Sequence, residues 1–203
     1  MKREQLLTQM RRNLKSSGGA PAPPRWTPPG ELFIQDADAR QALLIDRLAG
    51  LGANARVVDS RQEAQAAVEQ LMGERAWRQI SCPADLAWPS VADRLGQDEA
   101  LLPFGLVEAE WALAETGTVV ILPGGRHKRV TSLLPPAVGF IVRRSRILSR
   151  LTDVLVRFDA ASGGLPANVV FVSGPSRSAD IGSVVCRGVH GPGEVHVWVI
   201  ESE

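Results

Sequence analysis

The sequence contains only two cysteines among its 203 residues, Cys82 and Cys186. They lie far apart, and neither belongs to a Cys-x-x-Cys pair of the kind that supplies the ligands of iron–sulfur clusters and structural zinc sites. Two distant cysteines also make no disulfide framework. We therefore predict that this chain binds no metal and carries no redox cluster or other cofactor of its own.

The sequence also lacks an excess of charge and a long apolar run. Lys plus Arg number 23 against 22 for Asp plus Glu, a net charge of +1, so there is no broad field to hold nucleic acid or an anionic membrane. No segment reaches the length of a membrane span, and the first fifteen residues mix charges with a short apolar set, unlike a signal peptide. These features predict a cytoplasmic protein, without a membrane span or nucleic-acid partner, in which any anion site is local.

The first 30 residues differ in composition from the rest. Residues 2–15 place Leu6, Met10 and Leu14 at helical spacing among basic residues, which predicts a basic amphipathic helix. Residues 16–30, SSGGAPAPPRWTPPG, are so rich in Gly and Pro that they predict a linker. We expect two parts, the helix and linker at 1–30 and a single domain at 31–203.

Helical and strand patterns alternate from residue 36 onward. Helices are expected at 36–52, 60–73, 89–96 and 149–161; the second opens with a capping box from Ser60 to Glu63, and the last is capped by Ser149. Strands are expected at 55–59, near 80, and at 100–105, 137–142, 168–174 and 194–201. Residues 111–125 are expected to form either a strand pair or one bent strand broken at Gly117. Strands separated by helices predict an α/β fold with a mainly parallel sheet covered on both faces.

The segment SGPSRSADI follows the expected strand at 168–174. Gly174 lets the backbone turn, and Ser176, Arg177 and Ser178 are expected at the start of a helix, where free N–H groups and a guanidinium could bind a carboxylate or phosphate at the carboxyl end of the sheet. Alternatively, Ser178 only caps the helix while Arg177 and Asp180 form a surface ion pair.

Two further turns carry candidate chemical groups. In GVHGPGEV, His190 lies among glycines before a strand and could act as a general acid or base, or could only hold its turn; the spacing matches no nucleotide-binding motif. In AETGTVVIL, Glu115 precedes a glycine turn and could be a nucleophile or base, or could accept backbone N–H bonds. His196, on an alternating strand with Glu194 and Trp198 on the same face, is interpreted as structural. The run RRSR at 143–146 is expected to reach solvent or a partner.

Taken together, AETGTVVIL at 114–122, LLPPAVGFIV at 133–142, and SGPSRSADI with GVHGPGEVHVWVIE at 173–201 resemble the LUD domain family over about residues 31–203. The resemblance implies a three-layer α/β/α sandwich similar to the NagB/RpiA/CoA-transferase-like group. It implies candidate catalytic roles for Glu115, Asp180 and His190. The implied substrate- or anion-binding residues are Thr116, Gly117, Gly174, Ser176, Arg177 and Gly191, and Ser178 is a further candidate from its place at the expected helix start.

The resemblance further implies a part in bacterial L-lactate oxidation to pyruvate, as a cluster-free subunit that works with iron–sulfur partner proteins and is inactive alone. Its ligand would be a small carboxylate or another anion bound by Arg177 and His190. Two alternatives stay open: an autonomous acyl- or CoA-transferase-like enzyme with Glu115 as nucleophile, and a non-catalytic scaffold or regulator of the iron–sulfur subunits. The sequence leaves the oligomeric state, the true ligand and the electron acceptor open.

Overall fold

The computed structural model describes residues 8, 34–83, 86, 88, 102–123, 129–160, 166–179 and 185–202. Leu32–Glu203 form one compact unit. The basic helix and linker predicted at 1–30 lie almost entirely outside the described residues, and the helix predicted at 89–96 lies wholly outside them. The division of the chain near residue 30 therefore stays a prediction.

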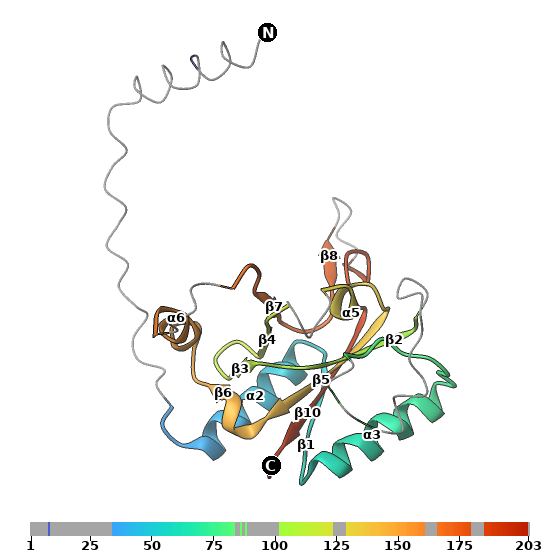
Figure 1. Ribbon diagram of the computed structural model, residues 1–203, viewed down its shortest axis with the longest axis horizontal. Coiled ribbons are helices and arrows are strands. Elements are labelled where there is room, and N and C mark those ends of the chain that lie inside the picture. The colour runs from blue at the N-terminus through green and yellow to red at the C-terminus, as the bar shows by residue number, and fades with distance from the viewer. Residues whose placement is uncertain are drawn as a thin grey trace. The chain divides into compact units, whose positions relative to one another are not determined.

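Four strands pair in parallel to form the central sheet (Figure 1). In spatial order they are β1 (Asn54–Val58), β10 (Glu194–Ile200), β5 (Ala137–Arg143) and β2 (Phe104–Glu108). Because all four run the same way, their first residues lie at one edge of the sheet, the amino edge, and their last residues at the opposite, carboxyl edge. The predicted mainly parallel sheet is confirmed.

A second, mixed sheet contains β6 (Ile147–Leu148), β3 (Trp111–Leu113), β4 (Thr118–Ile121) and β7 (Val170–Val172), in that order. Strands β3 and β4 form an antiparallel pair on either side of Gly117, so of the two expected alternatives the strand pair is found and not the single bent strand. A separate antiparallel pair joins β8 (Arg177–Ala179) to β9 (Val185–Arg187). The strand predicted near residue 80 is reduced to a single parallel bridge between Ser81 and Gly105.

The cap predicted for the second helix is confirmed. Among the described residues, the helical elements include α2 (Ala37–Gly50), α3 (Arg61–Glu74), α5 (Arg129–Leu133), the 3-10 turn η3 (Arg144–Arg146) and α6 (Leu151–Ala160). Ser60 caps α3, because its Oγ accepts a hydrogen bond from the backbone N of Glu63 at 3.2 Å. Within the described ranges, no helix combines the length and the apolar character that crossing a membrane requires.

The predicted cap of α6 at Ser149 is wrong. The hydroxyl of Ser149 donates to the carbonyl of Ile34 at 3.0 Å. The carboxylate of Asp153 instead accepts from the backbone N–H groups of Ser149 and Arg150, at 3.2 and 3.1 Å. An Asp in the first turn can satisfy these free N–H groups, so the serine is released to bind the segment before α2.

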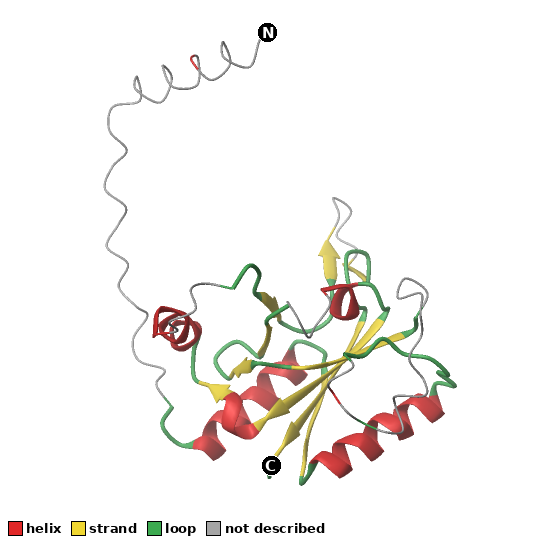
Figure 2. Cartoon of the chain, in the orientation of Figure 1, coloured by secondary structure: helices red, strands yellow, loops and turns green. Residues whose placement is uncertain are grey.

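Helices cover both faces of the central sheet (Figure 2). On one face, Val68 and Met72 of α3 share an apolar core with Ile141 and Trp198 of the sheet. On the other face, the buried core includes α2 and the inner side of the second sheet, and α6 covers the outer side of that sheet. Strands β5 and β10 are buried on both faces, which explains why AVGFIV and VHVWVI read as almost unbroken apolar runs.

Candidate functional site

A chain of hydroxyl groups joins two of the predicted motif segments. Thr116 Oγ1 lies 2.6 Å from Thr118 Oγ1, which lies 2.7 Å from Ser173 Oγ. The contact arises because β4 pairs with β7, which places the turn before β4 beside the turn after β7. The structure therefore brings together the ETGT and SGPS segments, which both contain candidate site residues.

Both of these turns pack against the last turn of α2. Gly117 has φ +62°, and a Cβ there would lie 2.8 Å from Cβ of Arg47. Gly174 has φ +75°, and a Cβ there would lie 2.8 Å from Cβ of Leu51. Only glycine satisfies both the positive φ and the close approach. The two motif glycines are thus required by packing, whatever ligand the turns bind.

The carboxylate of Glu115 is half-buried beside this contact. Its backbone N donates to the carbonyl of Ser149 at 3.0 Å, which fixes the start of the turn. No residue in the described ranges forms a hydrogen bond or an ion pair with the Glu115 carboxylate. The alternative in which that carboxylate only accepts backbone N–H bonds within its turn therefore has no support among the described residues.

The SGPS segment also meets the His190 turn, through backbone groups. The N–H of Ser176 donates to the carbonyl of Pro192 at 2.8 Å, and the N–H of Gly188 donates to the carbonyl of Ser176 at 3.1 Å. The side chains of Arg177 and His190 are exposed, and no interaction with another described residue is seen for either. The turn also carries Gly191, which lies beside Ser176. A Cβ on Gly191 would lie 3.5 Å from Cβ of Ser176, an ordinary van der Waals contact.

Two features of the predicted anion site are wrong. Arg177 and Ser178 begin a strand and not a helix, because they pair with Arg187 and Cys186 of β9. The His190 turn lies at the amino edge of the sheet and not at the carboxyl edge, since it precedes β10. Asp180 lies outside the described residues. An anion at these loops would thus be held by side chains and turn N–H groups, without a helix terminus.

Ion pairs occupy the carboxyl edge, where the sequence predicted a ligand. Glu108 pairs with Arg143 at 2.6 Å and with Arg61 at 3.5 Å. Arg144 pairs with Glu201 and Asp38. Hydrogen bonds from Gln41 and then Arg144 lower the pKa of the Glu201 carboxyl below its usual value. In the run RRSR, Arg143 and Arg144 form these ion pairs within their own domain, while their side chains stay 38% and 30% exposed to solvent.

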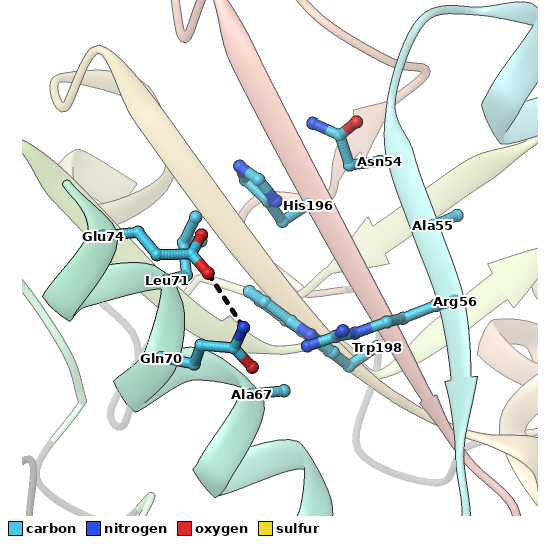
Figure 3. Close-up of a pocket in the computed structure, with 9 residues that line it drawn as sticks. All are labelled: Asn54, Ala55, Arg56, Ala67, Gln70, Leu71, Glu74, His196 and Trp198. Atoms are coloured by element: carbon cyan, nitrogen blue, oxygen red, sulfur yellow. Dashed lines mark hydrogen bonds between the residues drawn. The ribbon is translucent and has the colours of Figure 1, made fainter.

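The structure shows a pocket that sequence reasoning missed. It has a volume of about 280 Å³ and lies between α3 and the strands β1 and β10, on the face of the sheet that α3 covers (Figure 3). It is lined by Asn54, Ala55, Arg56, Ala67, Gln70, Leu71, Glu74, His196 and Trp198. The alternation of β10 correctly predicted that His196 and Trp198 share a face, but not that α3 leaves that face partly open.

The imidazole of His196 is oriented by a carboxylate. Its Nε2 lies 2.8 Å from Oε1 of Glu194, and Arg75 contacts the same carboxylate oxygen at 2.5 Å. Burial lowers the pKa of His196 below its usual value, against the opposing attraction of Glu194. The ring is therefore neutral at pH 7. Because a carboxylate only accepts hydrogen bonds, Nε2 carries the proton and Nδ1 is left as an acceptor.

Two aromatic rings pack against the imidazole of His196. His196 stacks on Trp198, with centroids 5.7 Å apart and planes at 12°, and meets Phe104 edge to face at 6.5 Å. A Cβ on Gly139 of β5 would lie 2.6 Å from both Phe104 and Trp198. The glycine on the central strand thus makes room for the rings that fix the orientation of His196.

A pH titration tests this description of His196. We expect NMR of the ring protons, assigned with a His196→Gln variant, to give a pKa below the usual value near 6.5. As the pH falls, His196 then binds a proton in the unfolded chain at a higher pH than in the folded chain. Its protonation therefore lowers the free energy of unfolding between a pH of about 6.5 and the lower pKa of the folded state. Glu194→Gln should lower the pKa further. A pKa at or above the usual value would show that the attraction of Glu194 outweighs burial.

Within the described ranges, no group of three His, Cys, Asp or Glu side chains is arranged to hold a metal ion. The residues described above form two separate candidate sites. One is the cluster of motif turns around Glu115, Ser176 and His190. The other is the pocket that contains His196.

Comparison with known proteins identifies relatives of the chain. The sequence model of the LUD domain matches residues 88–200. Lactate utilization protein C of Halalkalibacterium halodurans is 39% identical over 112 residues, which are 54% of this chain and 49% of that protein. Lactate utilization protein C 1 of Bacillus mycoides is 40% identical over 121 residues, 58% of this chain and 47% of that protein. The chain spans about half the length of the curated relatives it matches.

The fold also has a counterpart among solved structures. A crystal structure of a DUF162 family protein from Deinococcus radiodurans superposes with a TM-score of 0.60, and covers 82% of this chain and 99% of its own. Its sequence is 19% identical, so this likeness concerns the fold alone. The LUD match includes every predicted motif residue and His196, but not the pocket residues of β1 and α3.

Proposed function

Because the chain belongs to the LUD domain family, we propose that it acts in lactate utilization, as a cluster-free subunit of a system that oxidises L-lactate to pyruvate. The observation that carries this proposal is the match to relatives named lactate utilization protein C. Oxidation of lactate to pyruvate releases two electrons and two protons. In this proposal the electrons pass to iron–sulfur clusters held by partner proteins.

The cysteine content supports a subunit role. Cys82 and Cys186 are the only cysteines, and iron–sulfur clusters are usually held by four thiolates. A chain with two cannot hold such a cluster by itself in the usual way. We therefore assign electron acceptance to the partners and expect the isolated chain to oxidise no lactate.

The motif turns are the proposed site for a small carboxylate or other anion. The Thr116–Thr118–Ser173 hydroxyl chain and the Ser176–Pro192 bond support a shared site, since they join the ETGT, SGPS and His190 turns. In this proposal Arg177 binds the anion, which its guanidinium can do with two parallel hydrogen bonds. His190 contacts the oxygen that reacts, and Glu115 and Asp180 complete the site.

Reconstitution with the iron–sulfur partners tests the proposal. We expect lactate-dependent dye reduction only when this chain and the partners are combined, and no iron in the isolated chain. Arg177→Lys keeps the charge but loses the paired hydrogen bonds, and His190→Gln loses the titratable proton, so each should lower turnover by about tenfold or more. Arg157→Gln on α6 is the matched control, because its exposed guanidinium donates only to the carbonyl of Asp153 among described groups.

The reconstitution assay and one further incubation, with acyl-CoA, separate the alternatives. If Arg177 and His190 share a ligand, their effects should be non-additive in a double-mutant cycle. Wild-type turnover in both single variants would contradict the proposed site. Full turnover by the partners without this chain would contradict the subunit role, and an acyl adduct on Glu115 after incubation with acyl-CoA would identify a transferase instead.

A further inference from the structure

The pocket between α3 and the sheet contains polar groups that the rest of the described structure leaves unused. Among the described residues, none forms a hydrogen bond or ion pair with the side chains of Asn54 and Arg56. The Nδ1 atom of His196 has no described partner either, because the only described hydrogen bond of the ring is the one from Nε2 to Glu194. One cation, one amide and one acceptor nitrogen are therefore available to a ligand.

These groups lie within reach of one small molecule. Asn54 and His196 are direct neighbours across β1 and β10, so their backbones lie about 4.8 Å apart. Arg56 follows two residues later on the same face of β1, roughly 7 Å along the strand. Figure 3 shows Asn54, Arg56 and His196 among the residues that line the pocket beside α3. The charge of Arg56 also acts on the ring of His196.

The chemistry of the three groups selects the ligand. A guanidinium can bind a carboxylate through two parallel hydrogen bonds, and an amide N–H can donate to the same group. A neutral imidazole that presents Nδ1 as an acceptor needs a hydrogen-bond donor. Ala67, Leu71 and the ring of Trp198 form an apolar wall against which a short carbon chain can pack. The volume of about 280 Å³ is at the small end for ligand pockets, which favours a molecule of a few carbon atoms.

We propose that this pocket binds a small carboxylate that carries a hydrogen-bond donor, a hydroxyl or an ammonium group, on the carbon next to the carboxylate. Arg56 and Asn54 bind the carboxylate, and Nδ1 of His196 accepts the hydrogen bond from the donor. Glu194 and Arg75 hold the imidazole in the tautomer that this requires. The site uses none of the candidate catalytic or anion-binding residues of the motif turns, and it does not rest on the proposed function.

Binding of three matched probes to the isolated full-length chain tests the inference. L-lactate carries the hydroxyl, L-alanine carries the ammonium, and propionate carries neither, so calorimetry or NMR should show lactate or alanine bound in preference to propionate. Arg56→Gln should weaken binding of the preferred probe by at least tenfold, and so should Asn54→Asp, which places a like charge against the carboxylate. Both positions are exposed, so these changes should leave folding intact. The control Arg157→Gln should bind like wild type.

A second variant tests the role of the imidazole separately. His196→Gln should first be checked for folding by its thermal transition. The variant should lower the affinity for lactate or alanine more than it lowers the affinity for propionate. Equal binding of all three probes would overturn the donor requirement. Absence of binding to the wild-type chain, or wild-type affinity in Arg56→Gln, would overturn the site. Because this assay needs no iron–sulfur partner, its failure leaves the reconstitution result for the proposed function unchanged.

Discussion

Replacement of Phe104 by alanine is expected to lower the free energy of unfolding by about 3–5 kcal/mol. Phe104 is 0% exposed at the start of β2 and stacks on Trp77 with centroids 5.0 Å apart. The cavity left by its ring would be bordered by Trp77 and His196, whose rings contact it, and by Trp198, which stacks on His196. A chain of this size should lose roughly 6–20 °C in its midpoint of thermal unfolding.

The exposed Phe171 on β7 provides the matched control. It is 43% exposed, so Phe171→Ala should change the free energy of unfolding by at most about 1 kcal/mol. Urea unfolding followed by circular dichroism measures both variants. Phe104→Ala should also shift the ring resonances of His196, because it removes the edge-to-face contact. Similar losses in the two variants would show that the aromatic cluster behind the pocket is loosely packed.

Replacement of Gly105 by alanine is expected to have the next largest effect, a loss of about 3 kcal/mol. A Cβ at this position would lie 1.9 Å from the carbonyl oxygen of Thr131 in α5. The obstacle is backbone and not the end of a flexible side chain, so α5 has to move. That movement would break the 2.9 Å hydrogen bond between the hydroxyls of Ser81 and Thr131.

Gly73 in α3 is the control for this glycine. Nothing lies within 4 Å of a Cβ built there, so Gly73→Ala should stabilise the helix by about 0.5–1 kcal/mol. Thermal unfolding should therefore move in opposite directions in the two variants, down by roughly 6–12 °C for Gly105→Ala and slightly up for Gly73→Ala. A Gly105→Ala protein with wild-type stability would show that α5 is free to shift away from β2.

Most of the fold was predictable because its signals are local. The cap at Ser60, the helical spacing of α2 and the apolar runs of β5 and β10 each depend on a few adjacent residues. The direction of a strand relative to its distant neighbours has no such signal. Because β10 runs parallel to β1 and β5, the His190 turn that precedes it lies at the amino edge, whereas the predicted anion site was at the carboxyl edge.

The site was less predictable because its features depend on distant partners. SRSAD has the composition of a helix start, but pairing of Arg177 with Arg187, ten residues away, makes it a strand. His196 was interpreted as structural because a strand pattern shows which face a residue occupies and not what covers that face. The opening beside it depends on how far Ala67 and Leu71 of α3 reach across the sheet.

Strand β10 lies between β1 and β5, although it follows both of them in the chain. During synthesis on a ribosome, β1 and β5 are therefore made before the strand that pairs with both of them. Neither can form its backbone hydrogen bonds with β10 until residues 194–200 emerge. Such non-local pairing makes for slow folding and leaves unpaired strand edges exposed meanwhile. A nascent chain stalled before residue 194 should accordingly be a preferred client of chaperones that bind unpaired apolar strands.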